Sequence, residues 1–451
     1  MPTYLLFDVG STYTKGCIVD TQKDEILAIA NDLTTASIDI AIGIENVKRK
    51  MAPVLSKISI DQTLVCSSAK GGLKMIAVGL VPDLTLKAAT LACYSAGAKV
   101  IGSYSFELNQ SELKEIENAQ CDILLLSGGT DGGNYEVVIH NAKMIASLAP
   151  KFPVIYAGNK SCQDEIVSLF RKANVDCVCC ENVMPTYGIL QVDQCRELIR
   201  ELFLRTIVKA KGLSELSSII DDIVLPTPMS VMEALKLLSK GTSTEIGIGD
   251  LMAIDIGGAT TDVYSMNAHF VLKDNIGYKG LREPLDKRSV EGDLGVRFSA
   301  HNVADLKKDE PEYDHGMRDY LQQIQDNIHC DIDPDKDSVL AAWCTNIATQ
   351  RHAGRLETSY SPMGVGYYQS GKDLRDVSVM VGIGGPLLHS KDPLSILEMT
   401  LSDPNHPEIL LPDKLEYYLD SNYVVSCLGL LASRHPDTVV RLLKRNMEKI
   451  I

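Results

Sequence analysis

The chain has 451 residues, of which 45% are hydrophobic and 23% charged, as is typical of globular rather than disordered or fibrous proteins. Its 59 acidic and 44 basic residues give a net charge of −15. This acidity argues against a nucleic-acid-binding protein, because that function needs a basic face. At about 150 residues per domain, the length predicts about three folding units, or two lobes with an insertion.

Neither a membrane span nor an export signal is expected from the sequence. No stretch approaches the roughly 18 apolar residues that a spanning helix needs. The first residues lack a basic region, and Asp8 interrupts the short apolar run. The 12 cysteines are scattered through a large chain, which favours free thiols in a reducing compartment. We therefore expect a cytoplasmic protein without membrane or nucleic-acid partners.

The N-terminal segment has the pattern of a hairpin. Buried strands are predicted at Tyr4–Val9 and Gly16–Asp20, separated by a turn of small and hydroxyl residues. Beyond them, the pattern predicts a third strand at Glu25–Ala30, an amphipathic segment around Ile38–Leu55, a strand at Thr63–Ser67 and a glycine-rich corner at Gly71–Gly72.

From about residue 85 to residue 204, short apolar strands alternate with helices. Strands are predicted at Lys99–Tyr104, Asp122–Leu126, Val154–Ala157 and Val175–Cys180, and helical periodicity lies between them, as at Gln110–Asn118 and Gln163–Ala173. Because strands separated by helices form parallel sheets with crossovers, we expect an α/β insertion with its own sheet.

The second half of the chain begins with a break and another hairpin. Pro226 and Pro228 interrupt the chain, and a helix is predicted next. The remaining predicted elements are that helix at Met229–Lys240, strands at Leu251–Ile256, Val263–Met266 and Val377–Val381, and a terminal helix from about Val439.

The two hairpins share a sequence pattern. Residues 5–15 read LLFDVGSTYTK and residues 252–262 read MAIDIGGATTD, each with an apolar strand, an aspartate, a glycine two positions later and then hydroxyls. A glycine after a strand lets the backbone approach a phosphate, at which amides and hydroxyls then point. A carboxylate there needs a divalent cation or a water to separate it from the phosphate. The pattern predicts that Asp8 and Asp255 face an Mg²⁺-bound phosphate group from opposite sides.

A third loop contains several glycines. Residues 377–386 read VSVMVGIGGP, a strand that leads into Gly382, Gly384 and Gly385. Without Cβ atoms, these positions would let an adenine and a ribose lie flat against the backbone. Each loop alone is most often an ordinary turn, but the three together are more specific. The alternative nucleotide motifs GxxxxGK[ST] and strand-following GxGxxG are absent from the sequence.

In this order the three loops resemble those of the actin-like ATPase superfamily, which includes actin, heat-shock ATPase chaperones, hexokinase and acetate kinase. The resemblance implies an α/β fold of two ribonuclease-H-like lobes, here with an inserted Rossmann-like subdomain. It also implies that ATP with Mg²⁺ is bound, with Asp8 and Asp255 at the metal. By this resemblance phosphates are bound by Gly10, Ser11, Thr12, Thr14, Gly257, Gly258, Thr260 and Thr261, and adenosine by Gly382, Gly384 and Gly385.

The whole chain resembles the MutL/GlmL family of accessory proteins associated with glutamate mutase. The resemblance rests on spread blocks that include LLLSGGTDGGN at 124–134, PTP at 226–228, RSVEGDLGVR at 288–297 and RHAGR at 351–355. Together the resemblances imply an N-terminal actin-like lobe at 1–225 with the insertion at about 85–204, a connecting helix at 226–250, a C-terminal lobe with the adenosine motif at 251–425, and a connecting segment and helix at 426–451.

This family resemblance implies an ATP-binding and ATP-hydrolysing, chaperone-like reactivating factor for an adenosylcobalamin-dependent mutase of glutamate or ornithine type. Other functions fit the same fold. A small-molecule kinase would need a substrate base beside the γ-phosphate, for which Asp262 is the candidate. An ATPase activator of a radical enzyme would need cysteines that hold an iron–sulfur cluster, and a filament-forming protein is a further alternative.

Three charged residues are candidates for a role in ATP hydrolysis, and two of them have a second interpretation. In ATP hydrolysis, Glu291 is the candidate catalytic residue that places the attacking water, and Lys15 or Arg288 would neutralise developing charge at the phosphates. Otherwise Glu291 is a loop carboxylate that caps a turn, and Lys15 is a solvated strand residue.

Two segments of the predicted insertion also remain open. The loop Ser127–Asn134 either holds an anion, holds a metal through Asp131, or forms part of a partner surface; the simpler interpretation is a tight turn with Asp131 as a cap. Cys177–Cys180 contains a CxxC spacing without a second pair, which favours a structural strand over a metal or redox site.

Overall fold

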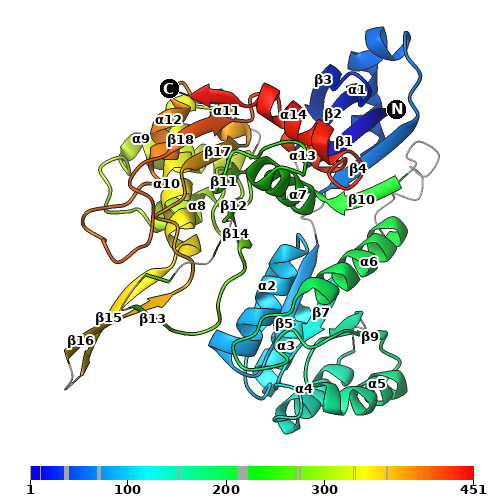
Figure 1. Ribbon diagram of the computed structural model, residues 1–451, viewed down its shortest axis with the longest axis vertical. Coiled ribbons are helices and arrows are strands. Elements are labelled where there is room, and N and C mark those ends of the chain that lie inside the picture. The colour runs from blue at the N-terminus through cyan, green and yellow to red at the C-terminus, as the bar shows by residue number, and fades with distance from the viewer. Residues whose placement is uncertain are drawn as a thin grey trace. The chain divides into compact units, whose positions relative to one another are not determined.

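The computed structural model describes residues 2–450 except 11, 35–39, 69–72, 150–151, 211–221, 268, 270–271, 274–275, 329, 331 and 362–363. It divides into two compact units, of which the first is Met1–Val231 with Gly280–Pro284 and the second is Met232–Lys279 with Leu285–Ile451. The division falls within helix α7, Thr227–Lys240 (Figure 1). Among the described residues, no helix has the length and apolar character needed to cross a membrane.

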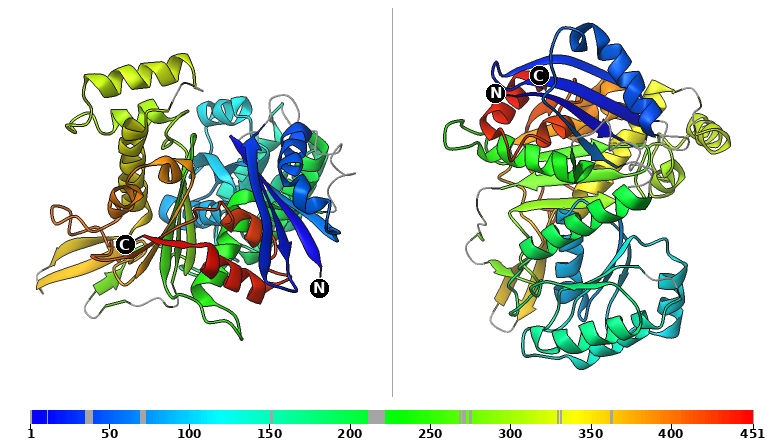
Figure 2. Two further views of the ribbon diagram at one scale, coloured as in Figure 1. Left: turned by 90° about the horizontal axis from the view of Figure 1, so that it is seen from above. Right: turned by 90° about the vertical axis from the view of Figure 1, so that its right-hand side faces the viewer.

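The first unit contains a five-stranded mixed sheet in the order β10-β4-β1-β2-β3. Its strands are β1 Thr3–Val9, β2 Tyr13–Asp20, β3 Glu25–Leu33, β4 Gln62–Ser67 and β10 Asp222–Pro226, and helix α1, Ile40–Leu55, packs across β1, β2 and β3 (Figure 2). Strand β1 pairs antiparallel with β2 and parallel with β4. Its near-continuous apolar run suits a central strand that is covered on both faces.

The first unit also contains a parallel sheet in the order β6-β5-β7-β8-β9. Its elements are β5 Lys74–Val78, α2 Lys87–Ser95, β6 Lys99–Tyr104, α3 Gln110–Asn118, β7 Ile123–Leu126, α4 Glu136–Ala146, β8 Val154–Tyr156, α5 Gln163–Lys172, β9 Cys177–Cys179 and α6 Asp193–Ala210. Helices α2 and α6 cover one face, and α3, α4 and α5 cover the other (Figure 1). The sequence predicted that the insertion starts at about residue 85. The sheet starts earlier in the chain, because β5 (Lys74–Val78) lies between β6 and β7.

The second unit contains a six-stranded sheet in the order β14-β12-β11-β17-β18-β19. Its strands are β11 Leu251–Ile256, β12 Thr261–Met266, β14 Asp286–Glu291, β17 Val379–Ile383, β18 Glu416–Leu419 and β19 Glu448–Ile450. The first five repeat the order of the N-terminal sheet: a three-stranded antiparallel part, then two parallel strands. The predicted α/β class with two ribonuclease-H-like lobes is therefore confirmed.

The helices of the second unit complete its core. They are α8 Ala300–Asp305, α9 His315–Asp326, α10 Pro334–His352, α11 Gly385–His389, α12 Pro393–Glu398, α13 Val425–Gly429 and α14 Pro436–Asn446. Helix α10 contacts β11, β12 and β14, and it starts where Asp333 accepts hydrogen bonds from the first-turn amides. The prediction that the chain ends in a helix is wrong, because α14 ends at Asn446 and β19 then pairs with β18.

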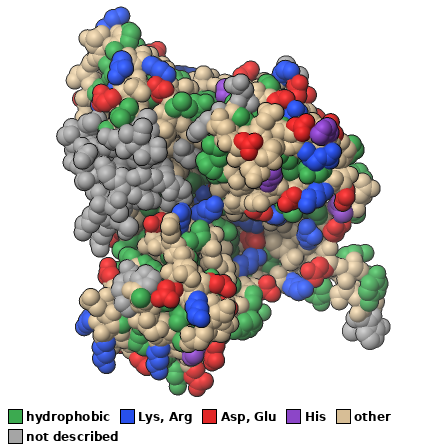
Figure 3. Space-filling model, turned by 180° about the vertical axis from the view of Figure 1, so that it is seen from behind, with side chains coloured by type: hydrophobic (Ala, Val, Ile, Leu, Met, Phe, Trp, Pro, Cys, Tyr) green, Lys and Arg blue, Asp and Glu red, His purple; other side chains and the backbone are tan. Residues whose placement is uncertain are grey.

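A small separate sheet extends from the second unit. It has the order β13-β16-β15, with β13 Ile276–Tyr278, β15 Arg355–Ser361 and β16 Gly364–Ser370. The β15–β16 hairpin projects at the lower right of Figure 3, with hydrophobic side chains at its surface. Tyr360 is 81% exposed and Val365 55%, so this hairpin contributes little to the core.

Candidate functional site

The first predicted phosphate loop is a tight turn between β1 and β2. The N–H of Gly10 donates to the carbonyl of Tyr13 at 3.0 Å, which closes the turn. A Cβ at Gly10 would lie 2.8 Å from that same carbonyl oxygen, so the turn requires glycine. Thr12 is exposed on this turn, and Ser11 lies outside the described residues.

Asp8 is almost fully buried beneath this turn, with 1% of its surface exposed. Thr227 donates a hydrogen bond of 2.6 Å to its Oδ1, and the Cys66 thiol lies 3.6 Å from the same oxygen. Lys15, which pairs with Asp8 across the hairpin, places its Nζ 3.6 Å from Oδ2. A buried carboxylate needs such compensation, and Lys15 is therefore not a solvated strand residue. Burial, followed by the charge of Asp8, raises the pKa of the Cys66 thiol well above its usual value.

The second predicted loop has the same construction. Between β11 and β12, the N–H of Gly257 donates to the carbonyl of Thr260 at 2.9 Å. The register is equivalent, because the last pair is Ile256 with Thr261 here and Val9 with Thr14 in the first hairpin. The repeated sequence pattern thus produces the same turn twice, once in each unit.

The carbonyl side of the second turn is fastened to residues 295–299. The amides of Arg297 and Phe298 both donate to the carbonyl of Gly258 at 2.8 Å, and the Ser299 hydroxyl donates to the carbonyl of Ala259 at 3.0 Å. The amides of residues 258, 259 and 260 donate to no acceptor in the described part of the chain. This turn therefore presents N–H donors while its carbonyls are engaged, which is the polarity that binds an anion.

Two of the predicted phosphate ligands have their hydroxyls in the core. Thr14 and Thr261 are fully buried. The Thr14 hydroxyl lies 3.0 Å from that of Thr34, and the Thr261 hydroxyl donates to the carbonyl of Leu294 at 3.0 Å. These hydroxyls bond within the fold, whereas Thr12 is exposed on the first turn and Thr260 is partly exposed on the second.

The glycines of the third loop have different structural roles. A Cβ at Gly382 would lie 2.9 Å from the Leu387 side chain, and one at Gly384 would lie 2.3 Å from the carbonyl oxygen of Ile256. Gly384 also has a φ of 110°, which disfavours other residues. Gly382 and Gly384 are thus required by the packing of the protein itself. Only Gly385, 3.5 Å from the Tyr423 hydroxyl, has room for a contact with a ligand.

The predicted residues of the second unit gather at one edge of its sheet. Asp255 lies near the end of β11 beside Ile383 of β17, and Thr261 at the start of β12 pairs with Glu291 at the end of β14. Strands β11, β14 and β17 end at this edge and β12 begins there. Asp255 is partly exposed at the edge, next to the donor turn. Asp8 and its turn belong to the first unit.

Glu291 is held by a residue that the sequence argument missed. Arg351, near the end of α10, contacts Glu291 at 2.7 Å and Asp293 at 2.9 Å through its Nη1. Burial raises the pKa of Glu291, although the hydrogen bond and charge of Arg351 act against that rise. Glu291 thus ends a strand and does not cap a turn. Arg351 was visible in the sequence only as part of the block RHAGR.

Arg288 and Asp262 form a buried pair on the same sheet. Nη2 of Arg288 lies 2.6 Å from Oδ1 of Asp262, and its Nε donates to the same oxygen at 2.9 Å. Arg288 is 4% exposed and Asp262 8%. The charge of Arg288 is therefore engaged within the protein, and the carboxylate of Asp262 is not placed to act as a substrate base.

The carboxylate of Asp8 is buried and engaged by Thr227 and Lys15. The partly exposed carboxylate of Asp255 fits Mg²⁺ bound together with a nucleotide. This ion is usually held by one or two carboxylates plus substrate phosphates, and not by an all-protein cage. Among the described residues, no group of three His, Cys, Asp or Glu side chains that could hold a metal is found. Cys177, Cys179 and Cys180 are free thiols.

Comparison with known proteins identifies the family. The family model described as MutL protein matches residues 4–447. Over 470 aligned positions, the chain is 43% identical to Protein MutL from Clostridium tetanomorphum, covering all of both chains. Among solved structures it is similar to the ethanolamine utilization protein EutJ from Carboxydothermus hydrogenoformans (9% identity, 95% and 88% coverage, TM-score 0.24), Plasmodium falciparum glycerol kinase with ADP (11%, 100% and 94%, 0.34) and a glycerol dehydratase reactivase (9%, 96% and 99%, 0.33). TM-scores this low carry no argument, but the match of the family model along almost the whole chain does. The chain belongs to the MutL protein family.

Proposed function

We propose that this protein binds and hydrolyses Mg²⁺-ATP, and that it uses the nucleotide to act as a reactivating accessory factor for an adenosylcobalamin-dependent mutase. The observation that supports nucleotide binding best is the repeated turn after Asp8 and Asp255. In the second of these turns the amides of residues 258–260 donate to no acceptor among the described residues, while the carbonyls are bonded. Such a turn suits phosphate oxygens, and the neighbouring aspartate suits the accompanying cation.

Each group then has a chemical task. The amides of Gly258 and Thr260 hold phosphate oxygens, and Asp255 orients the waters of the metal. Mg²⁺ bound with the nucleotide stabilises the charge that develops on the phosphates. Glu291, beside Thr261 at the same edge, accepts a hydrogen bond from the attacking water and aligns it. Lys15 places its Nζ 3.6 Å from Oδ2 of the buried Asp8 and so helps to fix that side chain beneath the first turn.

Reactivation requires that the two nucleotide states differ in their affinity for the client enzyme. To move a two-state equilibrium from 1:99 to 99:1 takes about 5.5 kcal/mol of differential binding. A loop that contacts the terminal phosphate of ATP but not of ADP can supply such a difference. We assign the client to the amino-acid mutases, of glutamate or ornithine type, because the family resemblance implies them.

The kinase alternative is less well supported. Its substrate base would be Asp262, which is buried against Arg288 at 2.6 Å. Removing a proton from a substrate hydroxyl would require this pair to separate, with the loss of a buried charge-assisted bond. No observation favours the iron–sulfur activator or the filament-forming protein.

The proposal is tested by calorimetry and by capture. Titration of ATP with Mg²⁺ into the folded full chain should give saturable heat, whereas nucleotide without metal should bind more weakly. Immobilised protein should retain a mutase from the native cell extract in one nucleotide state and release it in the other. An absence of heat with every adenine nucleotide would refute nucleotide binding. ATP turnover that rises only when a small metabolite is added would identify a kinase instead.

A further inference from the structure

The parallel sheet of the first unit has a switch in strand order. When its strands are numbered in chain order, the sheet has the order 2-1-3-4-5. The crossovers through α2 and α4 therefore leave β5 and β7 in opposite directions, and they lie on opposite faces. In open α/β sheets, ligands bind beyond the carboxyl ends of the strands at such a point. The loop that follows β7 at this position begins at Ser127.

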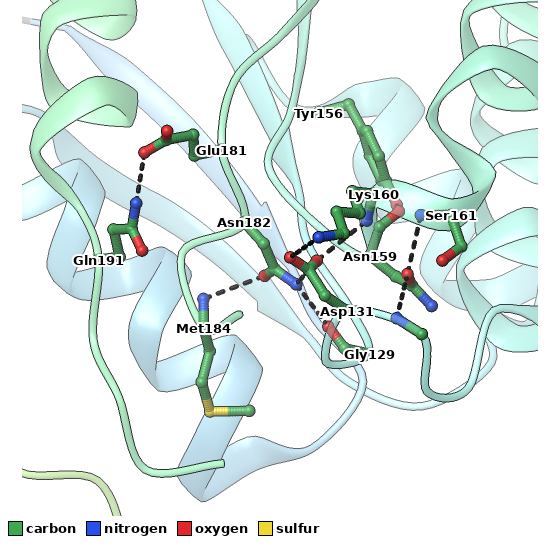
Figure 4. Close-up of polar contacts among 11 residues, drawn as sticks. Gly129, Asp131, Tyr156, Asn159, Lys160, Ser161, Glu181, Asn182, Met184 and Gln191 are labelled. Carbon is green, nitrogen blue, oxygen red and sulfur yellow. Dashed lines mark hydrogen bonds and ion pairs between the residues drawn. The ribbon is translucent and has the colours of Figure 1, made fainter. Parts of the chain in front are cut away.

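This loop is held in shape by polar side chains from the neighbouring loops (Figure 4). The fully buried Asn159 accepts hydrogen bonds from the amides of Gly132 and Ser161, both at 3.0 Å. Asn182 donates to the carbonyl of Gly129 at 2.9 Å and to Asp131 at 3.0 Å. The loops after β7, β8 and β9 are thereby joined into one rigid edge.

Asp131 belongs to this internal network. Besides Asn182, it accepts a hydrogen bond of 3.1 Å from the amide of Lys160, whose Nζ lies 3.8 Å from the other carboxylate oxygen. The carboxylate thus ties two loops together. It caps the first amide of the 3₁₀ helix Lys160–Cys162 and does not cap α4, the helix that follows its own loop. Of the interpretations that the sequence left open for Asp131, a metal ligand is the one this arrangement disfavours.

Three consecutive residues of the same loop have hydrogen-bond donors without an acceptor among the described residues. Ser127 is 1% exposed, and its hydroxyl has no hydrogen-bond partner in the part of the chain that the structure describes. The next two residues, Gly128 and Gly129, are also buried, and their amides donate to no acceptor among the described residues. Buried N–H and O–H groups without acceptors are rare, because each costs the free energy of its lost hydration. The hydrogen bonds of Asn159 and Asn182 hold the loop in this shape, and they provide no acceptor for the three donors.

We propose that the loop after β7 binds an oxyanion, the phosphate or carboxylate group of a small molecule, through the Ser127 hydroxyl and the amides of Gly128 and Gly129. Amide donors exclude a metal cation as the occupant. Lys160, with 73% of its side chain exposed, stands beside the loop, where its ammonium group offsets the negative charge of Asp131 that would otherwise repel an anion. The site does not include the aspartate hairpins, so it is a second binding site for a small molecule in this protein.

Selective labelling offers a direct test. The sequence contains two Ser–Gly bonds, at 127–128 and 370–371, so ¹³C-carbonyl serine with ¹⁵N-glycine yields two correlated amide signals. Inorganic phosphate and, separately, acetate are titrated into the full chain. We expect the Gly128 signal to move saturably with one of them while Gly371, the internal control, stays in place. The anion that acts distinguishes a phosphate ligand from a carboxylate ligand.

Variants add a second measurement. Ser127→Ala should weaken the anion by about tenfold in calorimetry, since one bond to a charged group is lost. If that variant does not fold, Lys160→Gln serves in its place and should weaken the anion several-fold, whereas Lys172→Gln on α5 should not. A Gly128 signal that ignores both anions, as it would if a trapped water satisfied the donors, overturns the proposal. So does a signal that moves together with that of Gly371. Neither result bears on nucleotide binding by the hairpins.

Discussion

Thr227, the first residue of α7, donates a 2.6 Å hydrogen bond to the buried carboxylate of Asp8, which lies 219 positions earlier in the chain. This contact joins the end of β10 to the first phosphate turn. Asp8 is thereby fixed from two sides, by the hydroxyl of Thr227 and by the ammonium group of Lys15. The carboxylate that anchors the turn is thus set in place by residues that the hairpin sequence alone does not identify.

Replacing Thr227 by valine keeps its shape and removes that hydrogen bond. Because the acceptor is a buried charged group, we expect the free energy of unfolding to fall by about 1–3 kcal/mol in a denaturant titration. Mg²⁺-dependent ATP hydrolysis should fall as well, since Asp8 loses its fixed orientation. Thr12→Val, an exposed hydroxyl on the same hairpin, is the matched control for stability. Equal stability of the two variants would contradict the structural role of Thr227.

Asp8 and Asp255 should both be required for hydrolysis, but with different effects on stability. We expect Asp8→Ala and Asp255→Ala each to reduce Mg²⁺-dependent ATP turnover by roughly tenfold or more. Asp8→Ala should also lower the unfolding midpoint, because the ammonium group of Lys15 loses its 3.6 Å partner. Asp255 is partly exposed, so Asp255→Ala should unfold close to the wild type. Turnover unchanged in both variants would remove the proposed role at the metal.

The local pattern of apolar and polar residues was enough to predict the two hairpins. It did not predict contacts between residues far apart in the chain. The strand at Lys99–Tyr104 was predicted with the bounds that β6 has, because apolar runs between helices are a local signal. The hydroxyls of Thr14 and Thr261 were predicted to bind phosphate. Instead they lie in the core, where Thr14 pairs with Val9 of β1 and Thr261 pairs with Ile256 of β11, so both positions belong to the sheets and not to the turns.

The partners of the predicted residues depend on tertiary structure. Strand β5 was missed because its short buried run looks like any apolar segment until β6 and β7 are placed beside it. Arg351 meets Glu291 from a helix 60 positions away, and no spacing rule predicts such a pair. The MutL family and the α/β class with two ribonuclease-H-like lobes were predicted correctly, because the motif blocks are spread along the whole chain.

Arg351 should set the pH dependence of hydrolysis through Glu291. Burial raises the pKa of Glu291, as do the charges of Asp293 and Asp262, and Arg351 is the group that opposes this rise. In Arg351→Gln the pKa should rise further, so the acidic limb of the turnover profile should move to higher pH. Arg351→Lys should move it less. In Glu291→Gln the limb should be absent, and adding Arg351→Gln to that variant should shift nothing.

The same groups predict a change in stability with pH. A carboxyl group whose pKa is raised by folding binds its proton more tightly in the folded chain, so it contributes most at low pH. Its contribution is lost as the pH rises from the ordinary carboxyl range through the raised value. Arg351→Gln should therefore lose more stability than the wild type across this interval, and the loss should extend to higher pH. Denaturant titrations at several pH values measure it, and parallel curves for the two proteins would contradict the assignment.

Substitutions at Gly384 and Gly385 test the structural role of the third loop and its proposed binding role separately. Alanine at Gly384 would bring a Cβ within 2.3 Å of the Ile256 carbonyl oxygen at a φ of 110°. We expect that change to cost roughly 2–4 kcal/mol of unfolding free energy. Alanine at Gly385 meets only the Tyr423 hydroxyl, at 3.5 Å, and should leave the fold intact. If adenosine lies against this loop, Gly385→Ala should raise the calorimetric Kd for ATP several-fold while the Kd for inorganic triphosphate stays unchanged. An equal rise for both ligands would place the added methyl group near the phosphates and not near the adenosine.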